Sequence, residues 1–404
     1  MRKEIIDVVV AGHICFDITP AFKKMGQSRL EEIFIPGKLI NVGAASVSTG
    51  GLVSNTGLAL RRLGIKAELM GKVGDDFYGQ ATIARLKSLG ADKGMVVVKG
   101  EESSYTIVIA PPGIDRIFLH NPGANDAFGV ADIDFELVRR AKLFHLGYPP
   151  LMKKLYTNRG KELLRIFKKA KATGVTTSLD FSLPDYDSPS GRVDWNAILK
   201  SLLPYVDLCL PSAEETMFML NKRKFLAKKK KADTRDMIDD FEPAEISWMS
   251  NKLLNYGAGI VIIKCGHRGV YLKTAGKGRL SKIGFAKPGD LINWSNRELW
   301  KPSFPVKKFG SAAGAGDSCV AGFLAAYVKG KSVEQTLQYA TAVGAQTVMR
   351  LDTTSGIKDW KETTRIINSA RTKNHLVLDD PRWEFDAAGH LWIGPDNCNS
   401  CHES

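Results

Sequence analysis

The sequence predicts an α/β fold with a doubly wound, mostly parallel sheet flanked by helices and a small β lid. Hydrophobic residues make up 44% and charged residues 25% of the 404 residues, which is ordinary for a globular α/β protein. Apolar runs of strand length alternate with helical periods along the chain. No apolar run approaches the roughly 18 residues that a membrane helix needs, so we expect no membrane partner.

The alternation begins at the N-terminus and continues through most of the chain. In the first part the expected elements are a strand at 5–12, a helix at 50–64, a strand at 66–74 and a helix at 75–90. Later strand-like runs lie at 139–148, 174–182, 205–212 and 257–266. Charged helical stretches separate these runs, and such connections favour parallel strands. Asp75 and Asp76 precede the second helix, where we expect N-caps rather than catalytic groups.

Two intervals break this rhythm and predict the accessory lid, from about 18–47 and 104–121. The second contains two short apolar runs about a Pro-Pro-Gly turn, which is typical of a hairpin. We expect the main domain to span 1–373 and residues 374–404 to be a surface or disordered extension. Stretches 221–250 and 274–305 have poor periodicity and are expected to be surface elaborations.

The chain carries a formal net charge of +14, but its basic residues are not organised as a nucleic-acid surface. The densest block, 221–236, contains one aromatic residue, Phe225, and no known nucleic-acid-binding motif accompanies it. We therefore expect a solvated segment and no nucleic-acid partner. A general positive field would also attract polyanionic nucleotides.

The cysteines favour a reducing compartment, and we expect the cytoplasm. Each of four cysteines lies in or beside an apolar segment, where a free thiol behaves as a small buried group: Cys15, Cys209, Cys265 and Cys319. Cys398, Cys401 and His402 match a c-type haem attachment pattern. Such attachment needs export, and no export signal is visible, so the alternatives are a weak metal site with His390 or a disordered tail.

A glycine-rich stretch, "FGSAAGAGDSCVAGFLAAYV", leads into an amphipathic helix from residue 309 onward. The small residues Gly314, Ala315 and Gly316 would leave the first backbone N–H groups of this helix open to an anion. Asp317 follows at once and has two interpretations. It is either a carboxylate that complements the helix dipole or a general base beside a phosphate site.

Two longer motifs are "SAAGAGDSCVAGF" from Ser311 and "GGLVSNTGLALRRLGIKAELMGKVGDDFYG" from Gly50 to Gly79. Together they resemble the signatures of the ribokinase/PfkB family of carbohydrate kinases. The resemblance covers roughly 6–374 and implies a ribokinase-like kinase domain. It also implies transfer of a phosphoryl group from ATP, with Mg²⁺, to a hydroxyl of a small sugar or sugar-like acceptor. Asp317 would be the general base.

The resemblance further implies an acceptor site at the first strand and the first long helix. Asp17 occupies the place of a family aspartate that holds sugar hydroxyls, although it could instead form a turn before Pro20. Gly50 and Gly51 would let the backbone approach the sugar and act as a hinge. Asn55 would present its amide to an acceptor hydroxyl.

For the nucleotide, the resemblance implies residues on later strands. Glu215 falls in the position of a glutamate that organises magnesium through water, and Ser212 replaces the asparagine of the same motif. Lys264 stands where the family has threonine, so it would contact phosphate or point to solvent. Gly266 matches the glycine of the same family motif. Thr341 occupies a position near the adenine where the family often has asparagine. Neighbouring Glu214 is expected to be a solvated charge.

Departures from the family pattern leave alternatives open. Ser311 replaces an aspartate that helps to coordinate a monovalent cation, which argues against potassium activation. This chain also differs from ribokinases proper at two places. Leu52 stands at one of them, and Gly147 or Tyr148 stands at the other. Both differences argue against ribose as the acceptor. A nucleoside or phosphosugar kinase, and a non-catalytic nucleotide- or sugar-binding regulator, remain alternatives. We also consider a homodimer formed through the lid.

Overall fold

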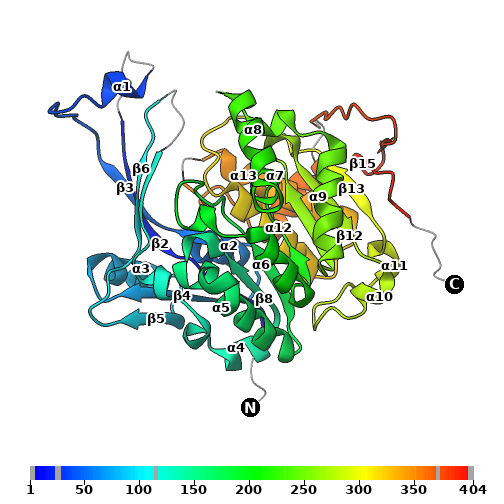
Figure 1. The fold of residues 1–404 in the computed structure, drawn as a ribbon, viewed down its shortest axis with the longest axis horizontal. Helices are drawn as coiled ribbons and strands as arrows, with labels where there is room; N and C mark the ends of the chain where they lie inside the picture. Colours follow the sequence, from blue (N-terminus) through cyan, green and yellow to red (C-terminus); the bar gives the residue numbers. More distant parts are fainter. Residues whose placement is uncertain are drawn as a thin grey trace.

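The computed structural model describes residues 5–22, 29–112, 117–233, 235–350, 352–369 and 374–398. These residues form one large sheet covered by helices and one small sheet that projects from it (Figure 1). The predicted α/β architecture with a small β lid is therefore confirmed. Among the described residues, no helix has both the length and the apolar character that crossing a bilayer requires.

Eleven described strands form the large sheet, and seven of them, from β5 to β11 in space, run parallel. In spatial order they are β5 (Gly94–Val98), β4 (Ala67–Gly74), β1 (Ile6–Gly12), β8 (Ala141–Gly147), β9 (Thr176–Asp180), β10 (Leu208–Cys209), β11 (Ile260–Lys264), β12 (Val270–Thr274), β13 (Glu298–Lys301), β15 (Leu391–Ile393) and β14 (Glu384–Asp386). The last four strands pair antiparallel. The central strands are apolar almost throughout because helices cover both of their faces.

Helices pack on both faces of the sheet, and each face has its own apolar core. One core includes residues of α5, α6, α7 and α9, and the other includes residues of α2, α12 and α13. The helices are α1 (Leu30–Ile33), α2 (Gly51–Arg62), α3 (Phe77–Ser88), α4 (Phe135–Arg139), α5 (Lys153–Ala172), α6 (Trp195–Leu202), α7 (Ala213–Leu220), α8 (Lys222–Ala232), α9 (Pro243–Asn255), α10 (Lys277–Leu280), α11 (Leu291–Trp294), α12 (Ala315–Val328), α13 (Val333–Val348) and α14 (Trp360–Ser369). Short 3-10 turns lie at Gly123–Ala127, Val130–Asp132, Pro149–Leu151, Ser190–Arg192, Leu203–Tyr205, Met237–Asp240 and Gly266–Arg268.

The small sheet is built from the two intervals that break the sequence rhythm. Its spatial order is β3 (Ala45–Gly50), β2 (Cys15–Pro20), β6 (Tyr105–Ile109) and β7 (Ile117–Asn121). Cross-strand partners share a face of a sheet, and one row across this sheet is polar: Ser48, Asp17, Thr106 and His120. The next row lies on the opposite face and is apolar: Val47, Ile18, Ile107 and Leu119.

Three segments are more integrated into the fold than their sequence pattern predicts. Stretch 274–305 supplies β13, in which Trp300 is fully buried. Stretch 221–250 forms α8 and most of α9, and these helices bury Phe225 and Met249. The expected surface or disordered extension instead adds β14 and β15 to the edge of the main sheet and buries Trp383. Cys401 and His402 lie outside the described residues.

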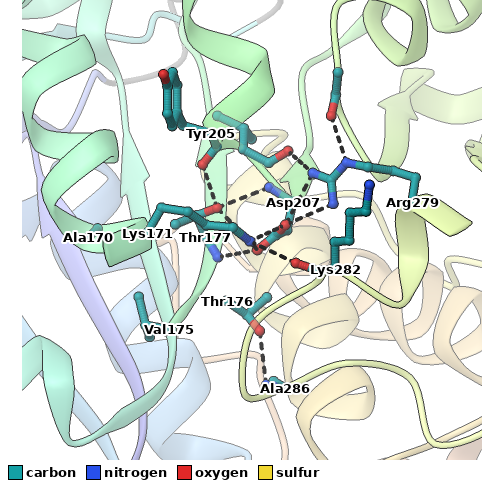
Figure 2. Close-up of polar contacts among 12 residues, drawn as sticks. Ala170, Lys171, Val175, Thr176, Thr177, Tyr205, Asp207, Arg279, Lys282 and Ala286 are labelled. Atoms are coloured by element: carbon teal, nitrogen blue, oxygen red, sulfur yellow. Dashed lines mark hydrogen bonds and ion pairs between the residues drawn. The ribbon is translucent and has the colours of Figure 1, made fainter. Parts of the chain in front are cut away.

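Near the amino-terminal ends of the parallel strands, the buried carboxylate of Asp207 connects α5, β9 and α10 (Figure 2). Asp207, which is fully buried, accepts hydrogen bonds from the Lys171 ammonium group at 2.6 Å and the Arg279 guanidinium group at 3.1 Å. It also accepts from the backbone N–H of Thr177 at 3.1 Å. A buried charge needs such partners, so this cluster is a structural connection remote from the carboxyl ends of the strands.

Candidate active site

Two of the predicted site residues, Ser212 and Lys264, lie where consecutive parallel strands end, together with Tyr148 and with Asp180, which the sequence analysis did not single out. Tyr148 follows β8, Asp180 ends β9, Ser212 follows β10 and Lys264 ends β11. A bridge pairs Ser212 with Lys264. In open α/β sheets the carboxyl ends of the strands form the ligand-binding crevice. This edge of the sheet is therefore the candidate active site.

The glycine-rich stretch forms the start of α12, as the sequence predicts. Gly314 is the N-cap with φ of 69°, a left-handed conformation that favours glycine. A Cβ atom on Gly314 would also lie 2.7 Å from the Cβ of Thr353. The next residues, Ala315, Gly316 and Asp317, form the first turn, whose N–H groups lack intrahelical acceptors. The N–H of Ala315 already donates to the carbonyl of Ala312 at 3.2 Å. The N–H groups of Gly316 and Asp317 are therefore the better donors to an anion.

Asp317 is 3% exposed and both of its carboxylate oxygens accept hydrogen bonds. The Asn55 amide donates to Oδ2 at 2.9 Å. The Tyr148 hydroxyl donates to Oδ1 at 2.6 Å. The base candidate therefore has a fixed orientation, held from α2 on one side and from the end of β8 on the other.

Burial raises the pKa of Asp317, whereas the hydrogen bonds from Tyr148 and Asn55 and the charge of Lys264 oppose this shift. A carboxylate with a raised pKa is a stronger base, provided that it remains ionised. The neutral donors and the nearby ammonium group favour the ionised form. The environment of Asp317 thus suits proton abstraction better than a solvated helix-capping role.

Lys264 lies beside the start of α12 at Gly314–Asp317, which we call the glycine cradle, and not in solvent. Its ammonium nitrogen is 2.5 Å from Oδ1 of Asp180. A Cβ atom built on Gly316 would lie 4.0 Å from the same nitrogen. Burial lowers the pKa of Lys264, but the carboxylates of Asp180 and Glu215 outweigh it, so the pKa stays above its usual value and the side chain is a cation.

Glu215 and Ser212 form a reciprocal capping box at the start of α7. The Ser212 backbone N–H donates to Oε2 of Glu215 at 2.6 Å, and the Glu215 N–H donates to Oγ of Ser212 at 3.2 Å. This arrangement is a stabilising helix start in its own right. Glu214, expected to be solvated, is partly buried, and burial with nearby carboxylates raises its pKa to about 7.

Two carboxylates at this edge suit a hard divalent cation. Asp180 is fully buried, and its Oδ2 atom has no hydrogen-bond partner. Glu215 lies close enough that its charge raises the pKa of Asp180. Among the described residues, no cluster of three or more His, Cys, Asp or Glu side chains could hold a metal by itself. Mg²⁺ is usually held by one or two carboxylates together with phosphate oxygens and water, and the residues present fit that pattern.

Asp17 lies on β2 with its carboxylate against Gly50. A Cβ atom on Gly50 would lie 2.0 Å from Oδ2 of Asp17, so a larger residue there would displace the Asp17 carboxylate. Gly51 has φ of 77°, and its Cβ would lie 2.6 Å from Nδ1 of His13. Burial raises the pKa of Asp17 to about 6, and the charge of Asp317 adds to this shift. The two carboxylates therefore share one electrostatic environment.

Histidines beside Asp17 were not singled out from the sequence. The Thr106 hydroxyl and Nδ1 of His120 are 3.0 Å apart, and Nε2 of His120 is 3.4 Å from Nε2 of His13. Burial lowers the pKa of both imidazoles, which are therefore neutral. His13 belongs to the β1–β2 connection and His120 to β7, so this pair joins the lid to the main sheet. No local motif signals such a long-range contact.

Other predicted residues are less directly connected to Asp317. Gly266 has φ of 52° at the turn after β11. Thr341 is 5% exposed, and its hydroxyl donates to the carbonyls of Leu337 and Gln338 in its own helix. Asp76 is the N-cap of α3 and accepts from the N–H of Gly79 at 2.8 Å, which confirms the capping interpretation for this residue. For Asp75 that interpretation was wrong, because its carboxylate accepts from the N–H of Gly100 at 2.8 Å and does not cap α3.

Comparisons with characterised proteins agree with this geometry. Residues 6–360 match the model of the pfkB family carbohydrate kinases. An ATP-dependent ribose-1-phosphate kinase from Halopiger xanaduensis is 25% identical over 85% of this chain and 93% of its own length. A fructokinase-1 from Oryza sativa subsp. japonica is 31% identical over 42% of this chain and 52% of its own length.

Solved structures share the fold. Arabidopsis thaliana ribokinase complexed with ribose and ATP superposes with a TM-score of 0.66 at 19% identity, covering 91% of this chain and all of that one. A ribokinase II structure from E. coli in complex with ATP and Mg²⁺ gives a TM-score of 0.65 at 21% identity, over 91% of this chain and all of that one. Because the family match spans most of the sequence, the chain belongs to the pfkB family and is an ATP-dependent carbohydrate kinase.

Proposed function

We propose that the chain transfers the γ-phosphoryl group of ATP to a hydroxyl of a small sugar or sugar-like acceptor, with Asp317 as general base. The observation that carries this proposal is the buried carboxylate of Asp317 in the first turn of α12, directly beside the anion cradle. Phosphoryl transfer depends mainly on positioning and charge stabilisation. The cradle and the base candidate supply both requirements within one helix start.

In this mechanism the acceptor lies between Asp17 and Asp317. Asp17 accepts hydrogen bonds from acceptor hydroxyls, and Asp317 removes the proton from the hydroxyl that attacks. The amides of Gly316 and Asp317, with the Lys264 ammonium group beside them, stabilise the charge on the transferring phosphoryl group. The polar row of the lid covers the acceptor and limits access of water, which would otherwise compete as a nucleophile.

We assign the nucleotide to the side of the site that comes from the later strands. Ser212, Lys264 and Gly266 would border the phosphates, and Thr341 would lie towards the adenine. Glu215 and Asp180 would hold Mg²⁺, with Glu215 acting through water. The metal would neutralise phosphate charge and orient the β- and γ-phosphates.

A phosphorylated acceptor is the second candidate. The relative from Halopiger xanaduensis is named as a ribose-1-phosphate kinase, and the net charge of this chain is +14. A positive field favours encounter with polyanionic substrates. A nucleoside acceptor is a further alternative. Family membership and the intact Asp317, glycine cradle and Glu215 oppose the non-catalytic regulator that was considered from the sequence.

One experiment separates these candidates. ATP consumption is measured with Mg²⁺ over a panel of free sugars, sugar phosphates and nucleosides, for the wild type and for Asp317→Asn. We expect one acceptor class to stimulate turnover, and kcat of the variant to fall by about 10² to 10⁴, since it retains the shape but loses the base. A variant with near wild-type turnover would refute the assignment of Asp317. A wild type that binds ATP and sugars but turns over none of the panel would favour the regulator.

We also propose a homodimer formed through the lid. The apolar row described above faces away from the polar row, and two of its side chains are largely exposed, Val47 at 59% and Leu119 at 50%. Exposed apolar rows of this kind are covered in interfaces. Light scattering should give twice the chain mass for the wild type, and Val47→Asp combined with Leu119→Asp should give monomers. A monomeric wild type at micromolar concentration would contradict the proposal.

The buried cysteines support a cytoplasmic location. Cys15, Cys209, Cys265 and Cys319 are free and buried. Free thiols persist in reducing compartments. Cell fractionation followed by detection of the native chain tests this location.

A further inference from the structure

Tyr148 has a backbone conformation that is unfavourable for a bulky side chain. It has φ of 64° and ψ of 41°, which is the left-handed region that a bulky residue rarely adopts. Its backbone N–H donates to the carbonyl of Asp180 at 3.3 Å, and its own carbonyl accepts from Leu151 at 3.0 Å. Unfavourable conformations that the surroundings enforce are concentrated at functional sites.

The neighbouring packing explains why the chain turns at this point. Gly147 ends β8, and a Cβ atom there would lie 1.9 Å from Cδ1 of Leu52 on α2. Gly12 ends β1, and a Cβ atom there would lie 2.4 Å from the carbonyl oxygen of Gly147. These contacts hold β8 tightly against β1 and α2, and they bring Tyr148 towards the helix that carries Asn55.

From this position the phenol reaches across the site to Asp317. Its hydroxyl is 2.6 Å from Oδ1, while Asn55 binds Oδ2. Burial raises the pKa of the Tyr148 phenol well above its usual value, and the charge of Asp317 raises it further. The phenol therefore keeps its proton and acts as the donor in this hydrogen bond.

We propose that Tyr148 is a positioning residue for Asp317, which its hydroxyl both orients and favours in the ionised form. This inference rests on the proposed role of Asp317 as the base. A carboxylate oxygen has two lone pairs, so Oδ1 can accept from Tyr148 and still face an acceptor hydroxyl. Without the phenol, the buried carboxylate would lose one of its two neutral donors and would take up a proton more readily.

Other charged groups act on Asp317 and must be considered in a pH experiment. Lys264 on β11 favours its ionised form. Titratable groups on β2, β9 and α7 also interact with it electrostatically, and they include Cys15, Asp17, Asp180 and Glu215. All of them are present in the wild type and in a Tyr148 variant. The difference between these two proteins therefore isolates the contribution of the phenol.

The matched pair of variants is Tyr148→Phe and Tyr256→Phe. Both tyrosines are half-buried, and both donate to a side-chain oxygen, Tyr256 to Oδ1 of Asn196 at 2.8 Å. Only Tyr148 contacts a titratable partner. Thermal unfolding is measured at pH 5 and pH 8 for the wild type, both single variants, Asp317→Asn, and Asp317→Asn combined with Tyr148→Phe.

We expect Tyr148→Phe to lower the melting temperature more at pH 8 than at pH 5, because the lost hydrogen bond is strongest to the ionised carboxylate. This pH dependence should vanish in the Asp317→Asn background and be absent for Tyr256→Phe. In the pH profile of kcat/KM, measured with the panel acceptor that the wild type turns over fastest, the acid limb should move up by about one unit.

The outcomes separate this inference from the proposed function. A pH-independent loss of stability for Tyr148→Phe, equal in both Asp317 backgrounds, would overturn the positioning role. If the pH-dependent coupling is present but Asp317→Asn leaves turnover unchanged, the contact between the two residues holds and the assignment of the base fails. If Asp317→Asn abolishes turnover and Tyr148→Phe leaves the acid limb unmoved, only the inference about Tyr148 fails.

Discussion

The Asn55 amide nitrogen is 2.9 Å from Oδ2 of Asp317, and the Asn55 amide oxygen accepts a hydrogen bond from Thr353 at 2.8 Å. Both ends of this amide are thus engaged by the protein. The Thr353 side chain in turn packs where a Cβ on Gly314 would lie. Asn55 therefore links α2, the cradle of α12 and the segment around Thr353, a position that suits control of the base as much as contact with an acceptor.

Asn55→Ala should reduce kcat and weaken acceptor binding while leaving ATP affinity nearly unchanged. The reason is that one oxygen of the buried Asp317 carboxylate loses its donor, at a cost of about 1–3 kcal/mol. Asp17→Ala should act mainly on the acceptor KM, since Asp17 contacts neither Lys264 nor the cradle. Titration of ATP and of the acceptor separately measures both effects. Weakened ATP binding with unchanged acceptor affinity would show that the two halves of the site are reversed.

Asp17→Asn should stabilise the fold at neutral pH although it impairs acceptor binding. The folded-state pKa of Asp17 is raised from 3.8 to about 6, so the folded protein binds this proton more tightly than the unfolded chain. Its ionisation therefore costs stability, and the cost grows as pH rises from about 4 to 6. The melting temperature of the variant should exceed that of the wild type at pH 8 and approach it at pH 4. Equal melting temperatures at both pH values would contradict the raised pKa.

The parts of the site that lie close together in sequence were predictable. The helix start at Gly314–Asp317 follows from small residues placed before an apolar helical period, and the Asp76 cap follows from its position before α3. These features depend on backbone conformation within one turn of helix, which local residue types largely determine. The sequence predicted a mostly parallel sheet as a fold class, but it did not predict the order of the strands in that sheet.

The contacts between distant segments were not predictable. Tyr148 and Asp317 are 169 positions apart, and Asp180 and Lys264 are 84 apart. Which strand ends become neighbours depends on the order of strands in the sheet, and apolar strand sequences do not specify that order. The strands after residue 373 were missed because each is three residues long, too short for an alternating pattern.

Potassium should leave turnover unchanged. At position 311 a serine hydroxyl stands where the family has a carboxylate, and a neutral oxygen binds a cation more weakly than a charged one. Oγ of Ser311 also accepts a hydrogen bond from the N–H of Ala313 at 3.1 Å. Initial rates in potassium chloride and choline chloride at equal ionic strength provide the measurement. Strong activation by potassium would mean that other residues supply a cation site.

Asp207→Ala should destabilise the fold without changing the chemistry. It would leave two cations, Lys171 and Arg279, without their shared buried carboxylate (Figure 2), a change that costs about 3–5 kcal/mol. The matched control is Asp194→Ala, which removes an exposed N-cap carboxylate of α6 and should cost about 1 kcal/mol. Urea unfolding measures both variants. An Asp207 variant as stable as the control would contradict the structural role, and an altered KM for ATP in folded protein would contradict its remoteness from the site.

Lys264→Met should lower kcat and also destabilise the protein, and a second substitution separates the two effects. The methionine retains the apolar stem but removes the charge beside the cradle, and it leaves Asp180 buried without its cation. Lys264→Met combined with Asp180→Asn removes both charges, so unfolding measurements should show that much of the lost stability returns. Turnover should not return, because the cation that stabilises the transferring phosphoryl group is still missing and Asp180→Asn also weakens a proposed Mg²⁺ ligand, and kcat should stay about 10–10³-fold below the wild type. If the double variant recovers both stability and turnover, Lys264 serves only to neutralise Asp180, and the glycine cradle acts without it.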